Sequence, residues 1–89
     1  MKVLILYRPQ SSHGRTVEEF IDSLNGRTRH MRVEGMNVDS RDGGATASLY
    51  DIMQYPAVLV LQDNGSLHKS WEGPEVPPRL EEVVSYAFV

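Results

Sequence analysis

The sequence has 89 residues, of which 40% are apolar and 24% charged, and its formal net charge is −3. It contains no cysteine, which excludes disulfides, cysteine-based metal sites and thiol catalysis. A chain of this length predicts a single small domain over residues 1–89, and its apolar runs are far shorter than the ~20 residues that cross a bilayer. We therefore expect a soluble, cytoplasmic protein without a signal peptide.

The charges are unevenly spread along the chain. Residues 1–32 carry six basic and three acidic side chains, whereas residues 33–89 carry three basic and nine acidic ones. This asymmetry either marks an anionic partner on one side or reflects solvated edges and loop ends. Nucleic-acid binding is disfavoured because the chain is acidic and has no basic-aromatic strip. The three histidines lack the paired spacing of a zinc site, so no metal is expected.

The first third of the chain predicts a strand, a loop and a helix. Residues 3–6 form a continuous apolar run, which is typical of a strand covered on both faces. After a polar loop over residues 8–14, apolar residues recur at helical spacing. They are Val17, Phe20, Ile21 and Leu24.

The ends of this helix are predicted from local signals. Thr16 and Glu19 have the spacing of a capping box, and Ser12 is a second candidate cap. Asn25-Gly26 predicts the end of the helix. Residues 31–38 then predict a second strand, in which the apolar parity changes near Gly35 and indicates a bulge or bend.

Residues 42–44 predict a loop, because they read Asp-Gly-Gly. A short helical stripe follows, made of Ala45, Leu49, Ile52 and Met53. Residues 57–61 predict a fully buried strand, and Asp63-Asn64-Gly65 predicts a hairpin turn.

The C-terminal part predicts one more strand and a last helix. Trp71 shares a strand face with Leu67, which favours core packing, and Gly73-Pro74 ends the strand. Pro77-Pro78 opens the helix. Its buried stripe is predicted to be Leu80, Val83, Val84, Ala87 and Phe88. The order β-α-β-α-β-β-α predicts an α/β domain with a four-stranded mixed sheet and helices on both faces.

This layout, together with the residues after the second helix, resembles the thioredoxin/glutaredoxin superfamily. The resemblance is strongest at Tyr55-Pro56, which is followed by an apolar strand, an Asp-Asn-Gly turn and Gly73. It implies a minimal thioredoxin-like domain, without the extra leading strand and helix of thioredoxins. It also implies that the Tyr55-Pro56 bond is cis and borders the active-site surface.

The active-site residues of that superfamily are absent. Its Cys-x-x-Cys motif corresponds to residues 12–15, or to residues 11–14 in a glutaredoxin-like alignment. The resemblance places the buried acid at Leu6, its lysine partner at Gly35 and the signature tryptophan at Arg8. Since nucleophile, resolving thiol and proton relay are all missing, the sequence predicts no redox enzyme and no cofactor.

The remaining surface is expected to bind a partner. A protein or an extended peptide is the first candidate, because the backbone beside the proline can pair with a peptide strand. The candidate residues are Ser12, His13, Gly14, Arg15, Tyr55, Pro56 and Gly73. Tyr55 either anchors the partner or packs over the helix end.

Two alternatives remain open. A helix N-terminus can hold a small anion, and this site would use Arg8, Ser11, Ser12 and Arg15. A glutathione site like that of glutaredoxins or glutathione transferases belongs to this alternative. Against it, Lys69-Ser70 stands where transferases place an acid and a serine, so the first residue has the wrong charge. The other alternative is a small structural subunit of an oligomer.

Overall fold

The computed structural model describes residues 1–27, 32–74 and 76–87. The elements follow the order β1 (Lys2–Tyr7), α1 (Gly14–Arg27), β2 (Arg32–Asn37), α2 (Arg41–Leu49), β3 (Ala57–Leu61), β4 (Leu67–Glu72) and α3 (Leu80–Ala87). The predicted order of strands and helices is therefore confirmed. The predicted positions of Met31 and Phe88 lie outside the described residues. Within the described residues, no helix has the length and apolar character needed to cross a membrane.

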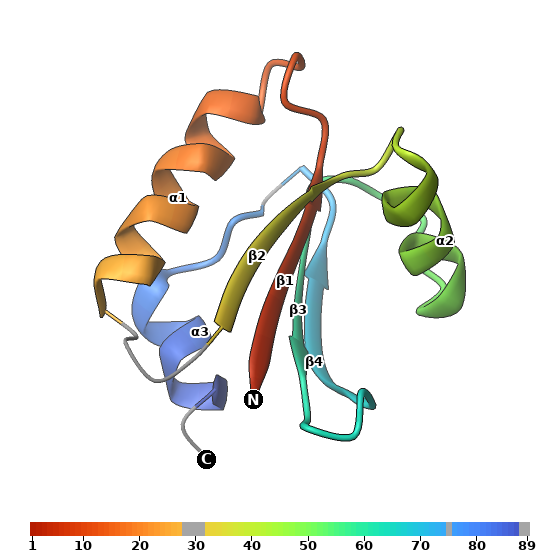
Figure 1. Cartoon of the computed structure of the whole chain (residues 1–89). Coiled ribbons are helices and arrows are strands. Elements are labelled where there is room, and N and C mark those ends of the chain that lie inside the picture. Colours follow the sequence, from red (N-terminus) through yellow and green to blue (C-terminus); the bar gives the residue numbers. More distant parts are fainter. Residues whose placement is uncertain (28–31, 75, 88–89) are drawn as a thin grey trace.

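The strands form one mixed sheet in the order β2-β1-β3-β4. β1 pairs in parallel with β2 and antiparallel with β3, and β3 pairs antiparallel with β4. Helices α1 and α3 cover one face of the sheet, and α2 lies on the other face (Figure 1). The two central strands are therefore buried from both sides, which explains their continuous apolar sequence.

Two apolar clusters fill the space between the sheet and its helices. On the α1 and α3 side, Val3, Ile5 and Tyr7 pack with side chains of both helices. On the α2 side, Leu4 and Leu6 pack with a smaller set that includes Ala47 and Ile52. The two clusters alternate along β1 because successive side chains of a strand point to opposite faces.

Helix α1 departs from its predicted ends. It begins at Gly14, and the carbonyl of His13 accepts the hydrogen bond from the Val17 N–H at 3.0 Å, so Thr16 lies inside the helix and does not cap it. A Cβ at Gly14 would collide with the Pro9 carbonyl oxygen, so glycine allows this close approach. The helix also runs through Asn25-Gly26 to Arg27; nothing lies within 4 Å of a Cβ at Gly26, which makes that glycine a weak helix former without a structural task.

The predicted bulge at Gly35 is wrong. Strands β1 and β2 pair in one unbroken register from Lys2 opposite Arg32 to Tyr7 opposite Asn37. A Cβ on Gly35 would lie 2.8 Å from the Ile21 side chain and 3.1 Å from the Tyr7 ring. Glycine at this position therefore allows α1 to pack closely against the sheet. The change of apolar parity does not interrupt the pairing of β1 with β2.

Helix α2 begins where the sequence predicts a loop. Ser40 caps it, because the Ser40 hydroxyl accepts a hydrogen bond from the Gly43 N–H at 3.0 Å. Gly43 lies inside the first turn because a Cβ there would collide with the carbonyl oxygen of Asn37. Most of the predicted stripe is wrong, since Ala45 is exposed and the exposed fractions of Leu49 and Met53 are 74% and 81%. Its fourth residue, Ile52, is buried as predicted but lies beyond the end of the helix. The buried residues of α2 are Gly43 and Ala47.

The C-terminal hairpin agrees with its sequence signals. Gly65 has a φ of +88°, and its N–H donates to the Gln62 carbonyl at 2.8 Å. The register shifts between Val60 and Leu61, so Leu67 pairs with Leu61 of the α2-side cluster and is largely exposed. Trp71 pairs with Val58 and packs, partly buried, against the α1-side cluster, so its packing role is confirmed. The predicted shared face with Leu67 is wrong, because the register shift pairs Leu67 with the opposite cluster.

Candidate binding face at the Tyr55-Pro56 loop

The candidate face begins with the loop between β1 and α1. The Arg8 N–H donates to Nε2 of His13 at 3.1 Å, and the Arg8 carbonyl accepts from the N–H of Ser11 at 3.0 Å and from its hydroxyl at 2.6 Å. Both backbone groups of Arg8 are therefore held by its own loop. His13 must present an unprotonated Nε2 in this arrangement, because that atom accepts a hydrogen bond.

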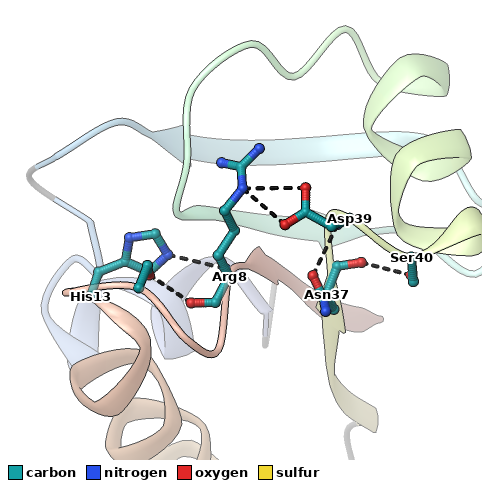
Figure 2. A network of polar contacts seen from close by, with 6 residues as sticks. Arg8, His13, Asn37, Asp39 and Ser40 are labelled. Carbon is teal, nitrogen blue, oxygen red and sulfur yellow. Dashed lines mark hydrogen bonds and ion pairs between the residues drawn. The ribbon is translucent and has the colours of Figure 1, made fainter.

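The side chain of Arg8 connects this loop to the residues before α2. Its Nε lies 3.3 and 3.1 Å from the two carboxylate oxygens of Asp39 (Figure 2). The Asp39 N–H in turn donates to the Asn37 side-chain oxygen at 2.9 Å, and the Ser40 hydroxyl donates to the Asn37 carbonyl at 2.7 Å. Arg8 and Asp39 are neighbours because the parallel strands β1 and β2 end at the same edge of the sheet.

Arg8 also contacts Tyr55. Its guanidinium carbon lies 5.1 Å from the centre of the Tyr55 ring, within the range of a cation–π contact. The Tyr55 hydroxyl donates to the Ile52 carbonyl at 3.3 Å, and the ring packs against the α2-side cluster. Tyr55 thus packs over the segment that follows α2 and presents part of its surface to Arg8.

The loop before β3 lies between the ends of β1 and β4. The Tyr55-Pro56 peptide bond is cis, and so is Val76-Pro77. The Pro56 carbonyl accepts a hydrogen bond from the Gly73 N–H at 3.1 Å, which ties this loop to the end of β4. Gly73 has a φ of +110°, and a Cβ there would lie 2.7 Å from the Gln54 side-chain oxygen, so only glycine fits.

Tyr55 offers the free backbone of this face. Within the described part of the chain, neither its N–H nor its carbonyl has a hydrogen-bond partner. Tyr55 is half-buried, and the Pro56 that follows it is fully buried. A backbone donor and a backbone acceptor without partners are the groups that pair with a strand from another chain.

The structure brings most of the predicted site residues together. Arg8 contacts Tyr55, the loop carries Ser11 and His13 against Arg8, and Pro56 holds Gly73. Arg15 is different: its side chain is 92% exposed and pairs with Glu19 one turn further along α1, at 3.3 Å. Ser12 is exposed, and among the described residues its hydroxyl has no hydrogen-bond partner.

The sequence reasoning missed Asp39 and Asn37. A signal for them exists, because the residues that follow two parallel neighbouring strands meet at one sheet edge. The sequence places Arg8 directly after β1 and Asp39 two residues after β2. Opposite charges at these two positions therefore predict an ion pair once the strands are known to be adjacent.

The positions that the resemblance assigns to a proton relay lie on opposite faces of the sheet. Leu6 is buried in the α2-side cluster, whereas Gly35 approaches Ile21 of α1. A different polar pair joins β1 to α1: the Tyr7 hydroxyl donates to Glu18 at 3.2 Å. Burial, the hydrogen bond to Glu18 and its negative charge raise the pKa of Tyr7, so the phenol stays neutral near pH 7.

This face has no thiol for redox chemistry. Thiol–disulfide exchange needs a thiolate, and the sequence has no cysteine. Over residues 1–27, 32–74 and 76–87, no group of three or more His, Asp or Glu side chains is placed to hold a metal ion. The face offers backbone donors and acceptors, an arginine and half-buried aromatic surface.

Comparison with known proteins shows the fold. No protein-family model matches the sequence, and neither does any curated protein. Thioredoxin O2 from Arabidopsis thaliana in its oxidised state superposes with a TM-score of 0.71 at 11% identity, over 94% of this chain and 69% of that one. Thioredoxin 1 from Thermosipho africanus gives 0.70 at 14% identity, over 97% and 89% of the two chains.

A structure described only as a malarial protein is also similar, with a TM-score of 0.75 at 9% identity, and the match covers 96% of this chain and 90% of that one. The chain therefore has a thioredoxin-like fold and lacks the cysteines of a thiol-redox site. Identities this low carry the fold alone.

Proposed function

We propose that this chain is a redox-inactive binding domain that holds an extended protein segment against the backbone of Tyr55. The observation that carries the proposal is that, among the described residues, the N–H and carbonyl of Tyr55 have no hydrogen-bond partner. A strand that pairs with them would lie across the end of the sheet, between Arg8 after β1 and Gly73 after β4. Main-chain pairing of this kind supplies affinity without any catalytic group.

The packing around Tyr55 supports a rigid receptor. Arg8 covers the ring, Gly73 holds the Pro56 carbonyl, and the Arg8 backbone is bonded on both sides. A partner that pairs with Tyr55 would therefore find the backbone already in place, which reduces the conformational entropy lost on binding. The contact surface would include the loop from Ser11 to Gly14.

The glutathione and anion alternatives have less support. The Ser11 hydroxyl is already donated to the Arg8 carbonyl, and Arg15 is paired with Glu19 away from the loop. Lys69 lies over the rings of Trp71 and Tyr86, at 5.6 and 5.4 Å from their centres. No observation favours a subunit role either, and the cytoplasmic location stays a prediction.

Two substitutions at one position test the backbone contact. Peptides are first selected from a displayed library of random 12-residue sequences on the immobilised wild-type chain. Tyr55→Ala removes the ring and keeps the N–H, whereas Tyr55→Pro also removes the N–H. If the backbone binds, we expect the proline variant to lose the selected peptides and the alanine variant to keep most of their affinity.

Circular dichroism and the melting temperature must first show that both variants are folded. Thr46→Ala on α2, where the hydroxyl donates to the Asp42 carbonyl within the helix, serves as a control for nonspecific loss of binding. Equal affinity of the two Tyr55 variants would contradict backbone pairing. A wild-type chain that selects no peptide would contradict the binding function as a whole.

A further inference from the structure

The guanidinium of Arg8 has free donors close to the Tyr55 ring. Its Nε is bonded to Asp39, but neither Nη group has a polar partner among the described residues. The side chain is 46% exposed, and the two Nη groups point away from Asp39 in Figure 2. Four N–H donors in a planar fork are therefore open to solvent beside Tyr55.

This fork is held in place before any partner arrives. The Arg8 backbone is bonded to His13 and Ser11, the Nε is fixed by Asp39, and Tyr55 supports the flat face of the group. A surface arginine normally loses much rotamer freedom when it binds. Here most of that freedom is already lost in the free protein, so a ligand acceptor would gain more of the hydrogen-bond energy.

The Tyr55-Pro56 loop has side chains of opposite charge on its two sides. β3 lies between β1 and β4, and Ala57 pairs with Leu6 on one side and with Glu72 on the other. Tyr55 and Pro56, which precede Ala57, therefore have Arg8 at the β1 side and Glu72 at the β4 side. The Glu72 carboxylate accepts a hydrogen bond from the Met53 N–H at 3.2 Å, which keeps it near the same loop.

From this arrangement we infer that the segment bound by Tyr55 carries an aspartate or glutamate whose carboxylate accepts hydrogen bonds from the Arg8 Nη groups. The inference rests on the proposed function. A carboxylate matches the two parallel donors of the fork. On the β4 side, Glu72 repels an acidic side chain. The acidic residue of the bound segment is therefore restricted to the Arg8 side, which fixes the direction in which the segment binds.

Asp39 sets the charge of the preferred ligand. Its carboxylate already compensates the charge of Arg8, so the free site is close to neutral. A single carboxylate brings one negative charge, whereas a phosphate group brings nearly two beside Asp39. The site therefore favours an aspartate or glutamate over a phosphorylated residue.

The experiment compares the peptides selected by three forms of the full chain. The displayed library of random 12-residue peptides is selected on the wild type, on Arg8→Gln and on Arg79→Gln. Arg79 is a matched control because it is an exposed arginine just before α3, and its substitution makes the same change in net charge. Melting temperatures verify that each form is folded before selection.

We expect the wild type and Arg79→Gln to enrich peptides with an acidic residue at one fixed position. Arg8→Gln should still select peptides but without this preference. For a wild-type-selected peptide, changing its acid to the amide, or Arg8 to Gln, should each weaken binding about tenfold, and both changes together should weaken it little further.

Four outcomes would overturn the inference. Enriched peptides without an acidic preference, or a preference that persists in Arg8→Gln, would contradict the role of Arg8 and leave the binding function standing. A stronger preference for phosphorylated than for acidic versions of one peptide would contradict the charge argument. Failure of the wild type to enrich any peptide would contradict both the inference and the function on which it rests.

Discussion

The two faces of the sheet are packed in different ways. On the α1 and α3 face, large side chains such as Phe20 and Leu24 fill the space against β1 and β3. On the α2 face, the helix approaches through Gly43 and Ala47, and its larger apolar residue Leu49 points into solvent. The first face depends on side-chain volume, and the second depends on close approach of two backbones.

This difference explains why the sequence predicts the buried face of α1 but not that of α2. Helical periodicity detects large apolar side chains, so the stripe of α1 is predicted well. A helix that docks through glycine leaves no such stripe, and Gly43-Gly44 therefore reads as a loop. Substitutions on the two faces should accordingly have different costs.

The largest effect is expected in a leucine pair. Leu24 is fully buried in the α1-side cluster, whereas Leu49 is 74% exposed at the end of α2. Leu24→Ala should lower the free energy of unfolding by about 3 kcal/mol, through lost burial and the cavity that remains. Leu49→Ala should change it by less than about 0.5 kcal/mol. Urea denaturation measures both, and similar losses at the two sites would contradict the contrast between the faces.

The next effect distinguishes two helical glycines. A methyl group at Gly43 would collide with the Asn37 carbonyl and lie 2.9 Å from the Ser40 hydroxyl. Gly43→Ala should therefore destabilise the protein by about 2 kcal/mol. Gly26 has open space around it, and Gly26→Ala in α1 should stabilise by about 0.5–1 kcal/mol. Thermal unfolding compares them, and a stabilising Gly43→Ala would show that α2 does not dock through its backbone.

A smaller effect is expected at the cap of α2. The Ser40 hydroxyl accepts from the Gly43 N–H and donates to the Asn37 carbonyl. Ser40→Ala should cost about 1 kcal/mol. Ser48→Ala, in the exposed part of the same helix, is the control. Because α2 contributes few large buried side chains, the stability of the helix should depend on its cap. An unchanged urea midpoint for Ser40→Ala would contradict this expectation.

The smallest effect is a pH dependence on the α1 face. The folded protein holds the Tyr7 pKa above its ordinary value near 10, through burial and Glu18. The unfolded chain thus ionises Tyr7 first, so its stabilising contribution is complete below about pH 10 and is lost as the pH rises through the folded pKa. Tyr7→Phe should cost about 1 kcal/mol at pH 7 and less above pH 10. Parallel stability curves for the two proteins between pH 7 and 11 would contradict this.

The fold was predictable because its strongest signals are local. The apolar run of β1, the stripe of α1 and the Asn64-Gly65 turn each specify an element without reference to the rest of the chain. Boundaries that depend on tertiary contacts were missed. Gly14 and Gly43 lie where one backbone approaches another, and Gly35 makes room for Ile21 and Tyr7. Glycine at such positions has the same sequence appearance as glycine in a loop.

The candidate site was predictable only in part. The resemblance indicated Tyr55, Pro56 and Gly73, which the structure places side by side. The contact of Arg8 with Asp39 joins residues 31 positions apart, so no local pattern reveals it. The cis bond at Val76-Pro77 has no local signal either, since most X-Pro bonds are trans.

Amide hydrogen exchange at Tyr55 tests the central claim most directly. In the free protein the Tyr55 N–H has no partner within the described residues, so it should exchange rapidly. Saturation with a peptide selected on the wild type should slow this exchange at least about tenfold, because the amide then donates to the bound strand. Unchanged exchange at Tyr55 with the peptide bound would contradict backbone pairing at this face.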